Sequence, residues 1–243
     1  MSVRVLINGA KGRMGTEAVA AVSEDPALEL VGQADLGDDL PKFIADSGAQ
    51  VVVDLTVAST AFENVSTIIE AGVSPVVGTS GLVADQVAQL QSKCSEKKLG
   101  GIIAPNFAIG AVLLMMFAKQ AAKHMPDVEI IELHHDKKED SPSGTAIKTA
   151  ELIAESRSAA SSRVVGKETV PGARGAEHYG VGIHSVRLPG LVAHQEVVFG
   201  GVGQTLSIRH DSLNRQSFMP GICLACREVT KLNELVYGLE HIL

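Results

Sequence analysis

The stretch Val3-Arg-Val-Leu-Ile-Asn-Gly-Ala-Lys-Gly-Arg-Met-Gly-Thr-Glu-Ala-Val-Ala-Ala-Val22 decides the fold class of this 243-residue chain. Its opening residues are β-branched and apolar, as in a buried parallel strand, and the residues after Gly15 have the apolar spacing of a helix. Between them, Gly9, Gly12 and Gly15 have the spacing G-x-x-G-x-x-G. A dinucleotide-binding loop needs a tight turn, a close backbone approach to a pyrophosphate and close packing of helix on strand. These glycines therefore indicate a Rossmann-like start.

An acidic residue follows where such a fold uses one. The strand-like run Leu28–Gln33 ends at Asp35, twenty residues beyond Gly15, where a carboxylate can accept hydrogen bonds from ribose hydroxyls. The alternative is a solvated Asp at the end of a strand. Lys11 and Arg13 lie on the loop itself and could neutralise a 2′-phosphate, so the sequence allows both NADH and NADPH.

Strand-like and helix-like segments then alternate. The pairs are Gln50–Leu55 with Ala58–Ala71, Ser74–Gly78 with Val83–Lys97, and then the strand Gly101–Ala104. This alternation predicts an α/β fold with a doubly wound parallel sheet, in which ligands lie outside the carboxyl ends of the strands. Gly78 and Thr79 are predicted neighbours of a nicotinamide, and an ordinary turn with a helix cap is the alternative for them.

The pattern changes after Pro105. A long helix is expected over Ala108–His124, and another over Gly144–Arg157, among the strand-like runs Val128–His134, Gly182–Leu188, His194–Gly200 and Gln204–His210. They predict a smaller α+β domain with a mixed or antiparallel sheet. We expect a dinucleotide-binding domain over 1–105 and about 216–243, and a substrate-binding and oligomerisation domain over 106–215. Ser158–Tyr179 is predicted to form surface loops, and Gln216–Lys231 a helix.

Composition excludes several classes of partner. With a net charge of -7, scattered basic residues, 3% aromatic residues and no Trp, neither a nucleic acid nor an anionic membrane is expected to bind. The first apolar segment is too short for a secretory signal or a membrane span, so a cytoplasmic protein is expected. The three cysteines are expected to be free thiols. Cys223 and Cys226 have redox-motif spacing, but they lie in an apolar, helix-like run where buried thiols are the simpler interpretation.

The residues that carry chemistry lie in Glu132-Leu-His-His-Asp-Lys-Lys-Glu-Asp-Ser-Pro-Ser-Gly-Thr-Ala146. His134 and His135 follow a strand, Lys138 lies in a loop, and a helix begins near Gly144. His exchanges protons near neutral pH, Lys supplies a proton or a positive charge, and a helix N-terminus binds anions. This combination suits a small anionic substrate that must be protonated. A solvated polar loop and a zinc site are the alternatives.

Six motifs along the whole chain resemble those of the dihydrodipicolinate reductases, also called 4-hydroxy-tetrahydrodipicolinate reductases, and more particularly their short actinobacterial type. They are Gly9–Gly15, Gly78–Gly81, Ala104–Phe107, Glu132–His135, Lys138 and Pro142–Ala146. The resemblance implies an NADH- and/or NADPH-dependent reduction of a small cyclic dicarboxylate in diaminopimelate and lysine biosynthesis. It also implies a homotetramer that shares a sheet interface. No metal is expected, because the stretch Glu132–Ala146 lacks the Cys neighbour or second spaced His of a zinc site.

The resemblance also implies residue roles. His134 matches an acid–base catalyst, and Lys138 matches a proton donor. The positions that match substrate-binding residues are His135, Lys138, Gly144 and Thr145, the last two for a carboxylate. The positions that match the cofactor site are Gly9, Lys11, Gly12, Arg13, Met14, Gly15, Asp35, Gly78, Thr79, Ala104, Asn106 and Phe107.

Leu55 departs from the aromatic residue expected in this family, which puts one cofactor contact in doubt, and Ser141 replaces a usual Ala.

Two other functions stay open at this point. One is another two-domain NAD(P)-dependent reductase or dehydrogenase, which would not need the two histidines and Lys138. The other is a non-enzymatic NAD(P)-sensing module of the same fold, which would not keep Lys138 or the anion site. Arg209 and Arg215 could reach substrate or cofactor, or form surface ion pairs.

Overall fold

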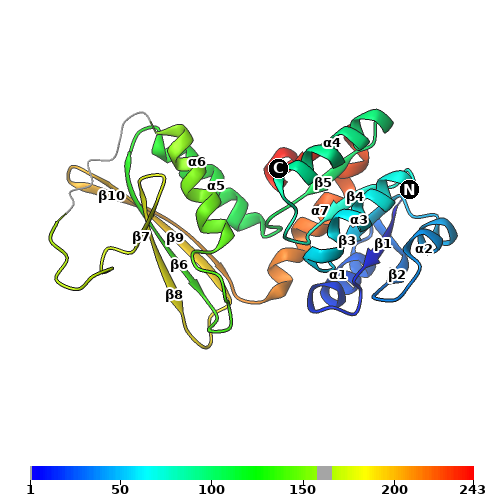
Figure 1. The fold of residues 1–243 in the computed structure, drawn as a ribbon, viewed down its shortest axis with the longest axis horizontal. Coiled ribbons are helices and arrows are strands. Elements are labelled where there is room, and N and C mark those ends of the chain that lie inside the picture. The colour runs from blue at the N-terminus through cyan, green and yellow to red at the C-terminus, as the bar shows by residue number, and fades with distance from the viewer. Residues whose placement is uncertain (1, 158–165) are drawn as a thin grey trace. The chain divides into compact units, whose positions relative to one another are not determined.

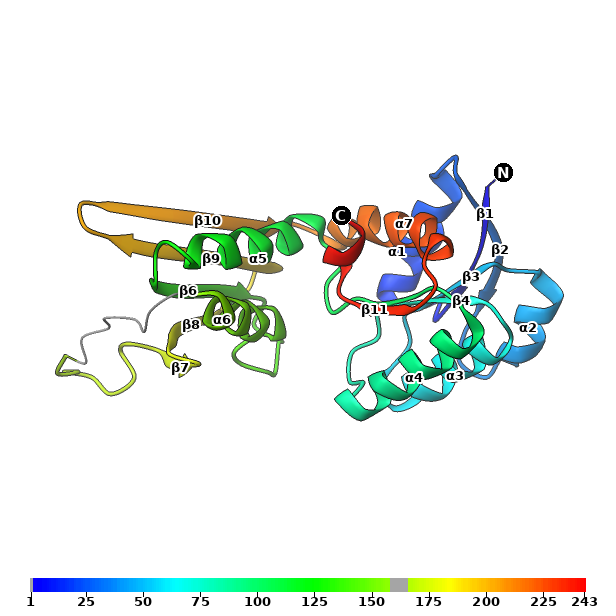
Figure 2. The ribbon, with the colours of Figure 1, turned by 90° about the horizontal axis from the view of Figure 1, so that it is seen from above.

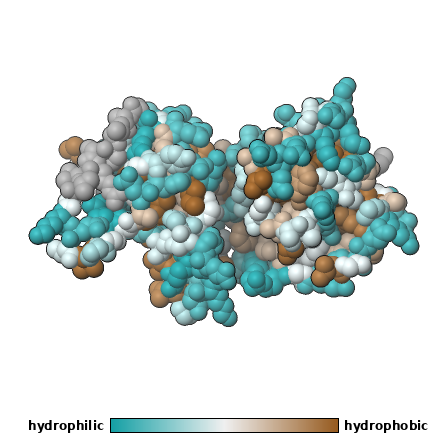
Figure 3. Space-filling model, in the orientation of Figure 1, coloured by the Kyte–Doolittle hydropathy of each residue, from teal (hydrophilic) through white to brown (hydrophobic). Residues whose placement is uncertain are grey.

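The computed structural model describes residues 2–157 and 166–243, which form two compact units (Figure 1; Figure 3 shows the same view as a space-filling surface coloured by hydropathy). The first unit contains Met1–Ile109 together with Arg215–Leu243, and the second contains Gly110–Asn214. The chain therefore leaves the first unit once and returns to it for its last segment.

The first unit is built on a parallel sheet of six strands. Its spatial order is β11-β5-β4-β3-β1-β2, with bounds β1 Val3–Asn8, β2 Leu28–Ala34, β3 Val51–Asp54, β4 Ser74–Val77, β5 Gly101–Ile103 and β11 Leu235–Tyr237. Figure 2 shows α1 (Arg13–Glu24) and α7 (Met219–Glu228) on one face, and α2 (Leu40–Ser47), α3 (Ala58–Glu70) and α4 (Ala84–Lys97) on the other. Helices on both faces bury the apolar strand centres completely, as at Val5 and Val52. The predicted doubly wound α/β fold is confirmed.

The structure differs from the sequence interpretation at the ends of this unit. Helix α1 begins at Arg13, inside the glycine motif, and not at Thr16. The C-terminal run is divided into a 3₁₀ turn at Arg215–Phe218, α7, and a second 3₁₀ turn at Val229–Lys231. Strand β11 was not predicted, since three residues are too few to show a period, and it pairs with β5 through Leu235 and Gly101.

The second unit has a mixed sheet with the order β10-β9-β6-β8-β7. The bounds are β6 Asp127–His134, β7 Ala176–His178, β8 Val181–Arg187, β9 Ala193–Gly201 and β10 Gln204–Ser212. Strands β6 and β8 are parallel and the other pairs are antiparallel, so the predicted mixed sheet is confirmed. Helices α5 (Ile109–Ala122) and α6 (Gly144–Ser156) cover one face of it (Figures 1 and 2). Alternate residues of β6, such as Ile130 and Glu132, are buried beneath them.

The predicted loop over Ser158–Tyr179 needs a partial correction. Its residues 158–165 lie outside the described part of the chain. Residues 166–175 are exposed without helix or strand, but Ala176–His178 form β7, an edge strand that pairs with β8. Its pattern was missed because the strand is short and carries Ala, Glu and His. Within residues 2–157 and 166–243, the helices are all too short or too polar to span a bilayer.

Candidate functional site

The glycine loop of the first unit has the backbone geometry that its sequence predicts. Gly9 has φ of 86°, and a Cβ there would lie 2.7 Å from the Leu55 carbonyl oxygen. A Cβ on Gly15 would lie only 2.0 Å from the Gly9 carbonyl oxygen. Helix α1 therefore packs so closely against the loop that only glycine fits at position 15. Gly12 occupies the N-cap of α1 and offers no capping side chain. The first N–H groups of α1 are consequently able to bind an anion.

A cavity of about 520 Å³ opens beside this loop. It lies where the strand order reverses between β1 and β3, the usual ligand position in such sheets. Its lining includes the predicted residues Gly9, Gly12, Arg13, Met14 and Asp35, and also Leu55, the position where the family is expected to have an aromatic residue. The residues that sequence reasoning did not assign to the cavity are Asn8, Leu36, Gly37, Asp38, Leu40, Thr56, Val57, Thr60 and Asn64. Its size is within the range of small-molecule sites.

Asp35 is fixed at the rim of this cavity by the glycine loop. Its carboxylate accepts hydrogen bonds from the backbone N–H of Lys11 at 2.6 Å and of Leu36 at 2.8 Å. These bonds, the one from Lys11 first, hold the pKa of Asp35 below its usual range. The side chain is therefore an anionic acceptor, which suits ribose hydroxyl groups.

The other predicted cofactor residues follow the neighbouring strands β4 and β5. Gly78 lies between two apolar side chains, because a Cβ there would be 2.7 Å from Leu55 Cδ2 and 3.0 Å from Phe107 Cε2. Ala104 and Phe107 are buried, and Asn106 accepts a hydrogen bond from the N–H of Ala108 ahead of α5. These residues do not line the 520 Å³ cavity. They form the adjoining part of the same sheet edge, where Leu55 occupies the place expected for an aromatic side chain.

Asp54, at the end of β3, ties these strand ends together and was not predicted. It is fully buried, and its carboxylate accepts hydrogen bonds from Asn8 Nδ2 at 2.9 Å, Thr56 Oγ1 at 2.8 Å, Asn64 Nδ2 at 3.0 Å and Thr79 Oγ1 at 2.5 Å. The Thr79 hydroxyl is thus engaged by the protein. The donors come from β1, α3 and the segments after β3 and β4, so one carboxylate fixes the carboxyl ends of these neighbouring strands.

These observations fit a nicotinamide dinucleotide. The glycine loop packs so closely on the Leu55 backbone and on the start of α1 that a Cβ at Gly9 or Gly15 would clash, the start of α1 offers N–H donors, and Asp35 offers an anionic acceptor for a ribose. Arg13, which lines the cavity, and Lys11 supply positive charge beside them.

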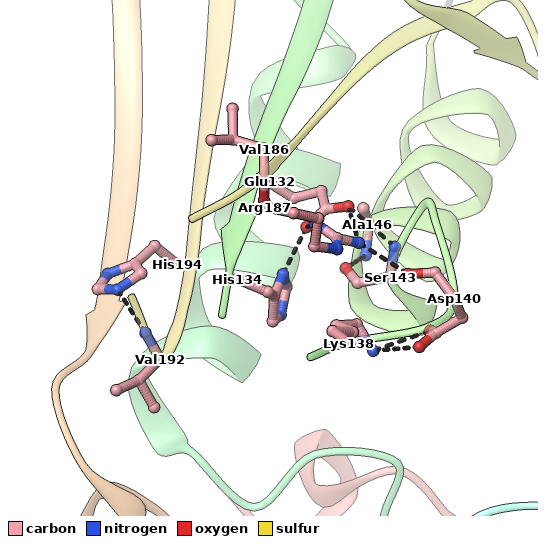
Figure 4. A network of polar contacts seen from close by, with 10 residues as sticks. All are labelled: Glu132, His134, Lys138, Asp140, Ser143, Ala146, Val186, Arg187, Val192 and His194. Carbon is pink, nitrogen blue, oxygen red and sulfur yellow. Dashed lines mark hydrogen bonds and ion pairs between the residues drawn. The ribbon is translucent and has the colours of Figure 1, made fainter. Parts of the chain in front are cut away.

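The second cluster of predicted residues lies in the second unit, at the exit of β6. His134 is the last residue of β6, and its Nδ1 lies 2.5 Å from Oε2 of Glu132, which is fully buried (Figure 4). His135 lies just past the strand and is exposed. Because β6 ends at His134, the two rings do not share one environment. Among the described residues, no group of three or more His, Cys, Asp and Glu side chains is arranged to hold a metal ion.

Arg187, the last residue of β8, completes the contacts of Glu132. Its two terminal nitrogens donate to the two carboxylate oxygens at 2.9 and 2.8 Å. Burial by itself raises the pKa of Glu132, but hydrogen bonds from His134, Arg187 and Ser185 outweigh it and lower that pKa to about 2. Glu132 is therefore ionised at neutral pH and can only accept hydrogen bonds.

The loop between β6 and α6 brings the lysine and the helix start to the same place. Lys138 Nζ donates to both carboxylate oxygens of Asp140, at 2.7 and 2.8 Å, and lowers the pKa of Asp140. Ser143 caps α6 by accepting a hydrogen bond from the N–H of Ala146. Gly144 opens the helix, and the space where a Cβ would be is empty. Together with Thr145 in the first turn, it forms a site that can accept a carboxylate.

Sequence reasoning gave no role to Glu132, Arg187 or Asp140. Arg187 is distant in sequence, and only its place at the end of a strand beside β6 could have indicated it. Arg209 lies in ion pairs with Asp211 and Glu196, which supports the surface ion-pair interpretation for it.

Two family models match this chain almost from end to end. The model described as dihydrodipicolinate reductase, N-terminus, matches residues 3–107, and the one described as dihydrodipicolinate reductase, C-terminus, matches residues 110–243. The chain is 51% identical over 243 residues to a 4-hydroxy-tetrahydrodipicolinate reductase of Legionella pneumophila, and 53% identical over 255 residues to one of Streptococcus gordonii. Both alignments cover 100% of this chain and of the relative.

Solved structures agree with the sequence matches. A dipicolinate-bound dihydrodipicolinate reductase from Paenisporosarcina sp. TG-14 is 46% identical, with a TM-score of 0.92 and coverage of 100% of both chains. GenD2 from gentamicin A biosynthesis, solved in complex with NAD, is 13% identical, with a TM-score of 0.66 and coverage of 95% of this chain and 87% of that chain. At this low identity, the likeness concerns the fold alone. The chain belongs to the dihydrodipicolinate reductase family, whose members are NAD(P)H-dependent oxidoreductases with a Rossmann-type cofactor domain.

Proposed function

We propose that this protein reduces 4-hydroxy-tetrahydrodipicolinate to tetrahydrodipicolinate with NADH or NADPH, in diaminopimelate and lysine biosynthesis. The observation that carries the proposal is the β6–α6 junction, where a histidine with a fixed ring, a lysine and the N-terminal turn of α6 lie together (Figure 4). A relative solved with dipicolinate bound supports a small cyclic dicarboxylate as the substrate. The reaction adds a hydride and a proton to the ring, and the hydroxylated substrate also loses water.

The residues of the second unit divide the proton and anion chemistry. His134 acts in acid–base catalysis through Nε2, since its Nδ1 faces Glu132. Lys138 donates the proton that accompanies reduction, and to do so it exchanges its ion pair with Asp140 for the substrate. Gly144 and Thr145 hold a substrate carboxylate at the start of α6, and His135 contributes a further substrate contact.

The first unit holds the dinucleotide, which supplies the hydride when it is bound. The glycine loop from Gly9 to Gly15, with Lys11, Arg13 and Met14, faces the pyrophosphate, and Asp35 accepts from the adenosine ribose. At the nicotinamide end we place Gly78, Thr79, Ala104, Asn106 and Phe107. The buried Asp54 supports the placement of Gly78 and Thr79, because its hydrogen bonds with Asn8 and Thr79 tie the end of β1 to the segment that follows β4. The domain roles follow: residues 1–105 and about 216–243 bind the dinucleotide, and 106–215 bind substrate and carry the oligomer contacts.

We also propose a cytoplasmic homotetramer assembled through the sheet of the second unit. The half-buried apolar residues Ile131, Leu133 and Val198 point away from the buried side of that sheet and support such an interface. Light scattering on the purified protein measures the assembly. The more specific assignment to the short actinobacterial type stays a prediction, and the relatives from Legionella and Streptococcus lend it no support.

A spectrophotometric assay of NADH and NADPH oxidation, with freshly generated substrate, tests the activity and the residue roles. Lys138→Ala and His134→Ala should each lower turnover roughly 10²–10⁴-fold, the usual contribution of a positioned acid or base, with cofactor affinity unchanged. Lys137→Ala is the matched control, because it removes the neighbouring exposed lysine and should leave turnover near that of the parent. Oxidation of neither cofactor by the parent would contradict the activity, and normal turnover of both site variants would contradict the roles.

A further inference from the structure

Glu132 connects the proton-transfer residue and the anion site of the second unit (Figure 4). Its carboxylate has no exposed surface and accepts hydrogen bonds from three different segments of the chain. His134 Nδ1 on β6 lies 2.5 Å away, Arg187 on β8 donates at 2.9 and 2.8 Å, and the N–H of Ser143, the N-cap of α6, donates at 3.3 Å. A displacement of this one carboxylate would disturb all three segments.

The contact with Glu132 determines which nitrogen of His134 can react. An ionised carboxylate only accepts hydrogen bonds, so the proton between the two groups resides on Nδ1 of His134. Nε2 is left to exchange protons, and the ring cannot turn over without losing its partner. Histidines that bind metals or catalyse reactions are commonly oriented by a carboxylate in this way.

The second connection concerns the loop that carries the lysine and the anion site. Arg187 donates a further hydrogen bond of 2.8 Å to the backbone oxygen of Asp140, whose side chain holds Lys138. Through Arg187 and Ser143, the buried carboxylate therefore fixes both ends of the segment that joins the lysine to the start of α6.

We infer that Glu132, held by Arg187, is a positioning residue that fixes His134 with Nε2 available to the substrate and fixes the start of α6 relative to that ring. This inference rests on the roles proposed above for His134 and for the helix start. A purely structural ion pair would need only Arg187, which already matches both carboxylate oxygens, and buried ion pairs by themselves are weak sources of stability. A role of Glu132 in folding stability alone would therefore not require its contact with His134.

The test uses two variants, because a single neutral substitution leaves Arg187 buried without its counter-charge. Glu132→Gln preserves the shape of the side chain, and Glu132→Gln combined with Arg187→Met removes both charges. In either folded variant, kcat should fall roughly 10²-fold, within the range for a disrupted acid or base. The dissociation constant of NADH should stay that of the parent. Glu155→Gln, which removes an exposed ion-paired carboxylate at the far end of α6, is the control and should leave kcat unchanged.

A double-mutant cycle separates positioning from general damage. If Glu132 acts through His134, the variant Glu132→Gln/His134→Gln should be no slower than His134→Gln alone, since the ring to be positioned is already gone. Losses that multiply would show that Glu132 acts independently of His134 and would overturn the inference. Parent-like kcat in both Glu132 variants would overturn it as well.

Nuclear magnetic resonance of protein labelled with ¹⁵N-histidine gives a readout that does not depend on turnover. The Nδ1–H signal of His134, assigned by its loss in His134→Gln, should be protected from exchange in the parent and lost in both Glu132 variants. Glu129→Gln should change His184 instead, because Glu129 contacts His184 Nε2 at 2.8 Å. An unchanged His134 signal in the Glu132 variants would refute positioning. Failure of the proposed function would be recognised separately, by a parent that oxidises neither NADH nor NADPH.

Discussion

The packing of α1 on the glycine loop allows a quantitative prediction for Gly15→Ala. A Cβ at this position would lie 2.0 Å from the Gly9 carbonyl oxygen and 2.8 Å from the Ala10 Cα, and both neighbours are backbone atoms. Real Cβ atoms essentially never approach closer than 3.0 Å, so the loop and the helix must separate by about 1 Å. Overpacking of this kind typically costs about 1–3 kcal/mol. It also displaces the N–H groups at the start of α1 that we propose bind the pyrophosphate.

A cost of this size on the bound state corresponds to NADH binding that is roughly 5- to 140-fold weaker in Gly15→Ala, since each 1.4 kcal/mol corresponds to a factor of ten. The variant should also lower the melting temperature of the protein. Titration followed by NADH fluorescence measures the first effect, and circular dichroism measures the second. Gly166→Ala adds the same methyl group where, among the described residues other than its chain neighbours, no atom lies within 4 Å, and it should change neither. Parent-like affinity in Gly15→Ala would refute the argument that close packing shapes the phosphate site.

Three further predictions concern charged or titratable groups. Asp35→Asn should lower the ratio of NADH affinity to NADPH affinity roughly tenfold, because it removes the anionic acceptor that we propose for ribose hydroxyls. Parallel titrations measure both affinities, and equal losses of affinity for the two cofactors would show that Asp35 has no such role. Glu132 has a folded pKa of about 2 against an ordinary value of 4.5. Its stabilisation is thus present above about pH 4.5 and is lost as the pH falls towards 2, by about 3 kcal/mol in all. Protection factors of β6 amides, which correct for the pH dependence of intrinsic exchange, measure this loss between pH 5 and 2, and protection factors that stay constant over this range contradict it. Burial raises the pKa of Cys94 and Cys223 to about 11 and that of Cys226 further. All three thiols should resist a disulfide reagent at pH 8 until the protein is unfolded, and a fast-reacting native thiol would show that one is accessible.

Local sequence patterns predicted the elements of both sheets where apolar periodicity was strong. The strand at Val3, the glycine loop and the alternating units up to Gly101 follow from burial on both faces of a parallel sheet. The loop residues could be assigned because a left-handed turn at Gly9 and a close approach at Gly15 each allow only glycine.

The remaining features depend on contacts between residues that are distant in sequence. Asp54 appears in the sequence as an ordinary acid at a strand end, and only the fold brings Asn8, Asn64 and Thr79 to it. Arg187 likewise acquires its meaning from the parallel pairing of β6 with β8. Short elements such as β7 and β11 are stabilised by their neighbours rather than by their own sequence pattern, so no local signal announces them.

The return of the chain to its first unit also determines the order in which the units can be completed on the ribosome. The second unit is continuous from Gly110 to Asn214 and can close as soon as that segment has emerged. The first unit begins earlier but must wait for α7 and β11, because β5 pairs with Leu235–Tyr237 and Gly221 packs directly on the Phe107 carbonyl. Until the last residues are synthesised, the edge of β5 stays unpaired and open to other strands. The first unit is therefore the part that depends on synthesis through β11, and a chain truncated before Leu235 would carry a complete second unit beside an incomplete first unit.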